Sequence, residues 1–125
     1  MTSIANVALS GYDVAAKKIA VSANNVANQF STSRVENGKV VNEPYQPQRV
    51  EAISQEEGGV RARVVDKNPA ALEAPTAGGE LQQVPNVDTA EELVNAKIAT
   101  YDARANLAVI RAESKLQDYV IDIFT

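Results

Sequence analysis

The sequence predicts a mainly α fold in which long N- and C-terminal helices pack as an antiparallel coiled-coil-like pair, with a small β-hairpin insertion between them. All five prolines fall between Pro44 and Pro85, and five of the six glycines fall between Gly38 and Gly79. Both ends are therefore almost free of helix breakers. Each end also carries apolar residues at alternating steps of three and four, which is typical of packed helices. We expect an N-terminal helix at 1–30, a small β insertion and extended linker at 31–85, and a C-terminal helix at 86–125 that completes the helical core.

The N-terminal helix is predicted by an apolar seam with heptad spacing. Its members are Ala5, Leu9, Tyr12, Ala16, Ile19, Ala23, Val26 and Phe30. Gly11 is the one glycine in this segment, and it marks either a close helix approach or tolerated slack. Asn24, Asn25 and Asn28 gather on one side of the last turns. The residues alone leave open whether they form a polar ridge that fixes register between subunits or fray the helix end.

The C-terminal helix is predicted to start near Asp88, which can cap the first turn, with Glu91 positioned for a capping box. Its apolar stripe is near-heptad and wide. The stripe runs through Val94, Ile98, Tyr101, Ala105, Val109, Ala112, Leu116, Tyr119 and Ile123, and is widened by Leu93, Ala96, Ala103, Leu107 and Ile110. For Tyr101 and Tyr119, core packing and packing between subunits both remain open. We expect the two helices to pack on each other and on neighbours.

The middle of the chain predicts two hairpins. Asn37-Gly38 suits a type I′ turn, and alternating apolar residues flank Glu57-Gly58-Gly59. Arg61 and Arg63 would share one strand face, where they meet either acids of a neighbour or solvent. The following segment, 68–86, is expected to be irregular or extended.

Composition argues against catalysis and nucleic-acid binding. The 125-residue chain has a net charge of -4, with scattered basic residues and neither histidine nor cysteine. The usual metal ligands, general base and thiol nucleophile are missing, so we expect no enzyme activity, no cofactor, no catalytic residue and no metal site. Glu56-Glu57 and Glu91-Glu92 are interpreted as turn and helix-start acids. No apolar run reaches the roughly 20 residues of a membrane span, and the start lacks the pattern of a cleavable signal peptide.

Both ends resemble bacterial flagellar axial proteins, the family that includes the basal-body rod proteins. The segment ALSGYDVAAKKIAVSANNVAN (8–28) is similar to their N-terminal signature, and PNVDTAEELVNAKIATYDARANLAVI (85–110) to their C-terminal signature. The short insertion, a segment at 42–50 similar to a Gly-Gly-Pro-Tyr stretch of the family, and Ser31-Thr-Ser in place of Thr-Pro-Gly favour the proximal-rod type. The family's tyrosine before Glu-Ala-Asn falls on Ala103, with Tyr101 two residues earlier.

The resemblance implies a non-enzymatic structural subunit of the flagellar basal-body rod, the periplasmic drive shaft. Its implied partners are other rod proteins, copies of itself and the flagellar type III export apparatus, with no nucleic acid, no membrane span and no cleaved signal peptide. It also favours interface use of the asparagines. The alternatives are a helical-hairpin adaptor or export chaperone, and a divergent axial-family paralogue outside the proximal rod. The predicted subunit-interface residues are Leu9, Gly11, Tyr12, Ile19, Asn24, Asn25, Val26, Asn28, Phe30, Val94, Ile98, Tyr101, Asn106, Leu107, Val109, Ile110, Leu116 and Tyr119.

Overall fold

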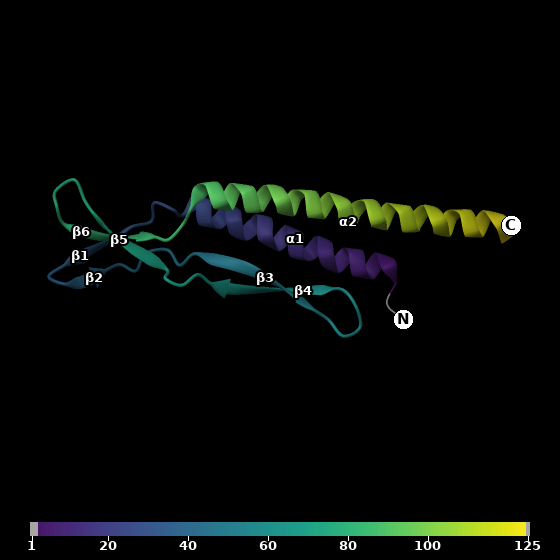
Figure 1. Cartoon of the computed structure of the whole chain (residues 1–125), viewed down its shortest axis with the longest axis horizontal. Helices are drawn as coiled ribbons and strands as arrows, with labels where there is room; N and C mark the ends of the chain where they lie inside the picture. Colours follow the sequence, from purple (N-terminus) through teal and green to yellow (C-terminus); the bar gives the residue numbers. More distant parts are fainter. Residues whose placement is uncertain (1–2, 125) are drawn as a thin grey trace.

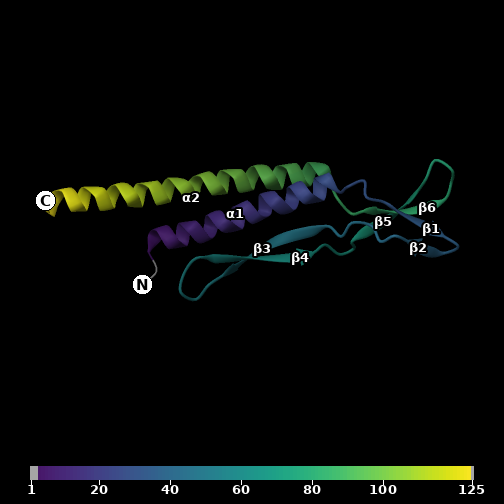
Figure 2. The same cartoon turned by 180° about the vertical axis from the view of Figure 1, so that it is seen from behind.

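The computed structural model describes residues 3–124 as an elongated molecule built from two long helices and six strands. Figure 1 shows helices α1 and α2 side by side, one hairpin along α1, and a separate sheet beyond the helix ends. The view from behind shows the same arrangement (Figure 2), with the C-terminal part of α2 continuing past the start of α1. The helix pair and the sheet thus lie in line along the long axis.

Helix α1 spans Ile4–Ala27 and has a polar cap at each end. The Ser3 hydroxyl accepts a hydrogen bond from the Asn6 N–H at 3.2 Å, which satisfies one of the free donors of the first turn. At the other end the Asn28 side-chain amide donates to the Asn24 carbonyl at 2.9 Å. These local bonds explain why the helix starts after Ser3 and stops before the loop at 29–32.

Helix α2 spans Thr89–Phe124 and starts where its sequence predicts. Asp88 Oδ1 accepts from the backbone N–H groups of Ala90 and Glu91, at 2.9 and 3.0 Å, so the predicted cap is confirmed. Within residues 3–124, the Glu91 carboxylate accepts no hydrogen bond from the Asp88 N–H, so no capping box forms there. Its Oε2 lies 3.8 Å from the Lys67 ammonium instead.

Two of the hairpins agree with the sequence analysis. Strands β1 (Ser33–Glu36) and β2 (Lys39–Val41) are antiparallel and joined through Asn37 and Gly38, whose φ angles are 50° and 73°. These positive angles suit a type I′ turn. Strands β3 (Gln48–Ser54) and β4 (Val60–Asp66) pair in the antiparallel register Val50↔Val64 and Ala52↔Ala62. This second hairpin packs along α1.

The predicted fold class, mainly α with a small β-hairpin insertion, is wrong. The segment expected to be irregular forms a third hairpin, β5 (Ala71–Pro75) and β6 (Leu81–Pro85). Strand β6 also pairs with β1, which produces a four-stranded antiparallel sheet in the order β2-β1-β6-β5. With β3-β4 as a second sheet, strands make up about 25% of the chain, so the fold is α+β.

Two prolines explain why this third hairpin is hard to predict. A proline inside a run of residues argues against a central strand, because it cannot donate to the ladder. Here Pro75 and Pro85 stand at the last positions of their strands, where a missing N–H does little harm. The turn between the strands is closed by the Thr76 N–H donating to the Glu80 carbonyl at 2.7 Å.

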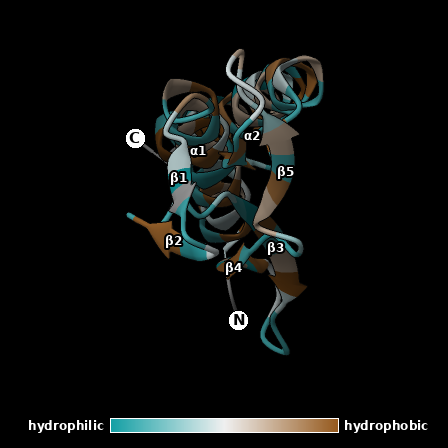
Figure 3. Cartoon of the chain, turned by 90° about the vertical axis from the view of Figure 1, so that its left-hand side faces the viewer, coloured by the Kyte–Doolittle hydropathy of each residue, from teal (hydrophilic) through white to brown (hydrophobic). Residues whose placement is uncertain are grey.

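The apolar core is thin and made of small side chains. The buried hydrophobic residues are Ala8, Val14, Ala15 and Ala99. Figure 3, seen from the sheet end, shows hydrophobic colouring distributed around the helices and strands instead of gathered at one centre. Small residues let the two helices approach closely but bury little area, so much of the apolar surface stays exposed.

Candidate subunit-interface surfaces

The contact between α1 and α2 follows a row of residues on α2 that includes three alanines and three polar side chains. The residues of this row recur every three or four positions and are all buried or half-buried: Glu92, Ala96, Ala99, Ala103, Asn106, Ile110 and Glu113. We call this row the inner seam. Asn25 contacts Glu92 at one end, and Gly11 lies against Asn106 farther along, which fixes the helices as antiparallel.

Gly11 marks a close helix approach. A Cβ atom added at Gly11 would lie 2.7 Å from Asn106 Oδ1, closer than real Cβ contacts allow. The Asn106 side-chain amide is held in place by donating to the Asp102 carbonyl at 2.9 Å. The interpretation of Gly11 as tolerated slack is therefore wrong, and both residues take part in a contact within the chain.

The residue just before Gly11 ties the β3-β4 hairpin to the helix. The Ser10 hydroxyl donates to the Val7 carbonyl at 2.7 Å and accepts from the Val60 N–H at 3.0 Å. Gly59 has a φ of 86°, and a Cβ there would lie 2.5 Å from Ser10 Oγ. No local sequence signal indicates this role of Ser10, because its partner Val60 lies 50 residues away in the chain.

Asn25 joins α1, α2 and strand β3 in a buried polar network. Its side chain is 0% exposed. The amide nitrogen donates to the Gln48 carbonyl at 2.7 Å and to Glu92 Oε1 at 2.8 Å, while Oδ1 accepts from the Gln48 N–H and the Tyr45 hydroxyl, both at 3.1 Å. All four hydrogen-bonding capacities of the amide are satisfied. Asn25 therefore offers no surface to a neighbour.

Tyr45 titrates differently because of this network. Burial raises the pKa of the Tyr45 hydroxyl above its usual value, and the nearby negative charge of Glu92 raises it further.

Next to the network, the Thr89 hydroxyl donates to Gln29 Oε1, linking the end of α1 to the start of α2. Glu91 and Glu92 both lie in the first turn of α2, as the sequence predicts, and Glu92 is in addition buried against Asn25.

The other asparagines differ from Asn25. Asn24 is exposed, and Asn28 is half-buried and caps its own helix. The predicted ridge of three asparagines on one surface is therefore wrong, because one of the three points into the molecule.

The predicted seam of α1 lies beside the contact with α2 instead of in it. Tyr12, Ile19 and Val26 are half-buried, whereas Leu9 and Phe30 are exposed. The residues buried on this helix form a different set, Ala8, Val14, Ala15, Ser22 and Asn25. The helix is therefore rotated relative to the orientation that its apolar pattern predicts.

The predicted stripe of α2 lies entirely on the exposed side. All its members are exposed, the larger ones between 42% and 78%: Val94, Ile98, Tyr101, Ala105, Val109, Ala112, Leu116, Tyr119 and Ile123. We call this row the outer seam. Core packing of Tyr101 and Tyr119 is thereby excluded. Of the residues expected to widen the stripe, Leu93 is exposed and Leu107 is half-buried, whereas Ala96, Ala103 and Ile110 belong to the inner seam.

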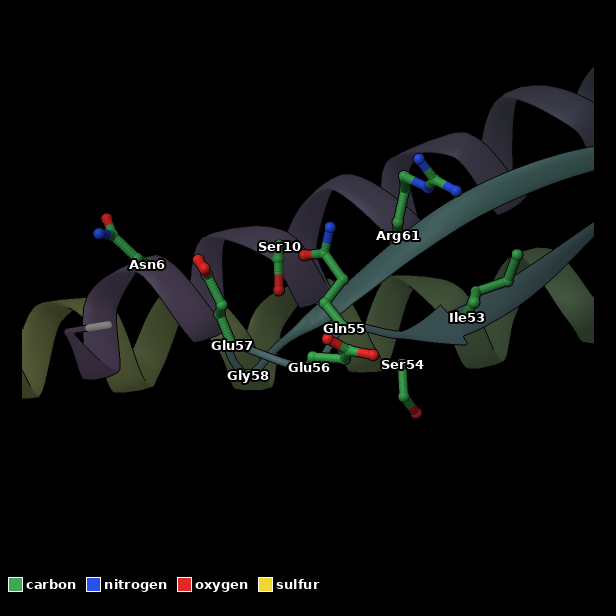
Figure 4. Close-up of a pocket in the computed structure, with 9 residues that line it drawn as sticks. All are labelled: Asn6, Ser10, Ile53, Ser54, Gln55, Glu56, Glu57, Gly58 and Arg61. Atoms are coloured by element: carbon green, nitrogen blue, oxygen red, sulfur yellow. The ribbon is translucent and has the colours of Figure 1, made fainter. Parts of the chain in front are cut away.

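A polar cleft of 510 Å³ lies between the first turns of α1 and the β3-β4 turn. Figure 4 shows Glu56 and Glu57 in this cleft with their carboxylates pointing in different directions, and Ser10 and Arg61 also line it. Within residues 3–124, no group of three or more His, Cys, Asp or Glu is arranged to hold a metal ion. The cleft is lined by polar side chains of α1, of the β3-β4 turn and of the strands that flank this turn.

Arg63 of β4 and Arg49 of β3 both meet an acid of their own hairpin. Arg63 donates to Glu51 Oε2 at 2.6 Å, and Arg49 to Oε1 at 2.9 Å. The Arg63 hydrogen bond, helped by the charges of both arginines, lowers the pKa of the Glu51 carboxyl. Arg61 stays exposed on the cleft.

Comparisons with known proteins add no family assignment. No family model matches the sequence, and a search of curated proteins found no match. Across residues 3–124, no helix is both long and apolar enough to cross a bilayer.

Proposed function

We propose that the chain is a structural, non-enzymatic subunit of the bacterial flagellar basal-body rod, most similar to flagellar basal-body rod protein C of the proximal rod. In this proposal it leaves the cytoplasm through the flagellar type III export apparatus and assembles in the periplasm with other rod proteins and copies of itself. The sequence resemblance at both ends motivates the assignment. The surface of α2 supplies the physical argument for assembly.

The observation that carries the proposal is the outer seam. A helix that exposes one broad apolar face along its whole length needs a partner, because apolar surface of this extent is unfavourable in water. The seam runs from Val94 to Ile123, about 44 Å at 1.5 Å per residue. Its heptad-like spacing is the pattern by which helices interlock with other helices. A subunit whose helices are covered by neighbours has this distribution of side chains.

The contacts within the chain fit the same proposal. The two segments that resemble the axial family, 8–28 and 85–110, pack on each other through Asn25, Glu92, Gly11 and Asn106. The residues of the resemblance therefore build the helix pair, and the large apolar residues of α2 remain for contacts with neighbours. Such a division of roles is expected of a subunit that assembles side by side with others.

Basal-body composition tests the proposal directly. In cells that produce the chain with a small tag, purified hook-basal bodies should contain it when analysed by mass spectrometry. Leu116→Asp should remove it from these particles, because a carboxylate would be buried between subunits at a position that is 63% exposed in the free chain. The purified variant should keep the circular dichroism and unfolding midpoint of the wild type, since the Leu116 side chain is mostly exposed in the free chain.

Ser114→Asp is the matched control. It adds the same charge two residues away, at an exposed position outside the outer seam, and should enter basal bodies normally. The adaptor or chaperone alternative predicts a different location. A wild-type chain that stays in the cytoplasm, and is absent from basal bodies, would contradict the rod proposal.

A further inference from the structure

The outer seam of α2 is bordered on one side by three basic side chains spaced seven residues apart. Lys97, Arg104 and Arg111 occupy equivalent positions on successive double turns, and all three are exposed. We call them the basic row. Seven residues make almost two full turns, so the row follows the outer seam along the helix and drifts from it by about 20° per step.

The basic row has no acidic partner among the described residues. None of its members has an aspartate or glutamate three or four residues away, the spacing at which charges pair on a helix surface. None of the three takes part in a salt bridge within residues 3–124. A solvent-facing helix of a monomer usually mixes opposite charges at these spacings, so this row is poised for charges from outside the chain.

We propose that the outer seam and the basic row together form the docking site for an acidic amphipathic helix of a different subunit. This inference rests on the proposed function and adds the chemistry of the partner. The partner helix places apolar residues over the seam and glutamates or aspartates, seven residues apart, opposite the basic row. In coiled coils the apolar seam supplies most of the buried area, while charges beside it select the partner and its orientation.

A second copy of the chain does not supply this partner. An antiparallel second α2 would bring its own basic row against the first, and like charges repel. A parallel second α2 in register would place Asp102 opposite Lys97, but Val109 and Leu116 opposite Arg104 and Arg111. Helix α1 has one acidic residue, Asp13. Neither helix of the chain therefore carries three acids with the required spacing.

A membrane surface is also a poor match. The most apolar part of the outer seam, around Tyr119 and Ile123, has Asp118 and Asp122 beside it. Anionic lipids would meet like charge at that end of the helix. Interfacial helices carry lysines and arginines along the whole polar face, whereas in α2 the basic residues end at Lys115 and the only charged residues that follow are Asp118 and Asp122.

The test uses the full chain and two designed helical peptides. Both peptides carry the same leucine and isoleucine seam and differ only in flanking residues, which are glutamate in one and lysine in the other. Binding is followed by fluorescence anisotropy at low and high salt. The wild type should bind the glutamate peptide about tenfold more tightly than the lysine peptide at low salt, because each of three exposed ion pairs changes affinity by about two- to threefold. The preference should shrink at high salt.

Charge reversal provides the decisive variant. Lys97→Glu/Arg104→Glu/Arg111→Glu should reverse the preference, so that the lysine peptide binds better. The matched control is Lys17→Glu/Lys39→Glu/Arg61→Glu, which changes net charge equally at exposed positions elsewhere. It should keep the preference for the glutamate peptide. Equal affinity for both peptides, an unchanged preference after reversal, or tight self-association that excludes both peptides would overturn the inference. Loss of peptide binding in favour of phosphatidylserine vesicles would also overturn it.

Incorporation into basal bodies separates this inference from the proposed function. If the wild type and the basic-row variant enter basal bodies equally while Leu116→Asp does not, the inference fails and the rod proposal stands. If the wild type never enters basal bodies but the peptide preferences are as expected, the rod proposal fails and the acidic-helix site stands.

Discussion

Asn24 and Asn25 are neighbours in the sequence with opposite surroundings in the fold. Asn24 is exposed, whereas Asn25 is fully buried and bonded to three other segments. Their side chains point about 100° apart on the helix, so a small rotation decides which of them faces inward. The sequence indicates that polar residues matter here. It cannot say which one is buried, because the partners Gln48 and Glu92 lie 23 and 67 residues away.

Replacing Asn25 should therefore destabilise the chain, while replacing Asn24 should not. Asn25→Ala removes four hydrogen bonds and leaves the buried Glu92 carboxylate without this donor, which should cost about 2 to 4 kcal/mol of unfolding free energy. Asn24→Ala removes an exposed side chain and should stay within about 0.5 kcal/mol of the wild type. Urea denaturation of the two variants measures the difference. Similar losses would show that the network does not hold the helices together.

Tyr45 should make stability depend on pH in the alkaline range. Its folded-state pKa is raised by burial and by Glu92, so the folded state favours the neutral phenol. This contribution is fully present below the unfolded pKa of about 10 and is lost as the pH rises through the folded pKa. Tyr45→Phe lacks this titration. The wild type should be the more stable protein at pH 8, because its hydroxyl bonds Asn25, and should lose this advantage above about pH 10.

Denaturant titrations at pH 8 and at pH 11 measure this change. Tyr119→Phe, at an exposed position on the outer seam, serves as the control and should track the wild type at both values. A constant difference between wild type and Tyr45→Phe over this range would contradict the assignment.

At the scale of elements, the sequence predicts correctly those helix ends and turns that depend on contacts between residues close together in the chain. The cap at Asp88 and the Asn37-Gly38 turn are set by bonds within a few residues, and both are found. The contact face of α2 was chosen wrongly because this helix has two seams with the same period. The outer seam has the larger side chains and so predicts the contact with α1. The inner seam, which includes Ala96, Ala99 and Ala103, makes that contact instead. Small side chains are what permit the helices to approach closely enough for Gly11 and Asn106 to touch.

The helix crossing gives a prediction about the sign of a substitution. Alanine is favoured over glycine in a helix by about 1 kcal/mol, yet a Cβ at Gly11 would press on the Asn106 amide. Gly11→Ala should therefore be neutral or destabilising in the wild type. In an Asn106→Ala background, where the amide is gone, the same substitution should stabilise the chain by about 1 kcal/mol.

A double-mutant cycle with urea denaturation measures this coupling. The four proteins required are the wild type, both single variants and the double variant. An equal effect of Gly11→Ala in both backgrounds would mean that the two residues do not constrain each other.

At the scale of the whole molecule, long-range pairing is what the sequence concealed. Ser33 pairs with Gln83 across 50 residues, and this single pairing joins two hairpins into the four-stranded sheet. No local sequence pattern predicts this contact between distant strands. Pro75 and Pro85 also argue against strands at β5 and β6. The outer seam can be recognised in the sequence as a stripe of apolar residues. Only the fold separates it from the small inner seam that already holds the helices together.

The two halves of α2 should differ in local stability within one molecule. The part from 92 to 110 packs on α1 through the inner seam, while residues 114–123 are exposed throughout. A helical segment whose side chains stay largely exposed is only marginally stable in water. In a dilute monomer, amide hydrogens of 114–123 should exchange within seconds, and those around Ala99, which is 0% exposed, should exchange far more slowly. Peptide-resolved hydrogen exchange measures this gradient.

Hydrogen exchange on the assembled chain tests whether neighbouring subunits stabilise residues 114–123. If neighbours cover the outer seam, residues 114–123 should gain protection on assembly, whereas the amides around Ala99 should change little. Leu116→Asp should show the wild-type gradient as a dilute monomer and no gain under assembly conditions, because its carboxylate opposes burial. A dilute wild type with equal protection along all of α2 would mean that this helix is already complete, and that covering the outer seam is not needed to stabilise it.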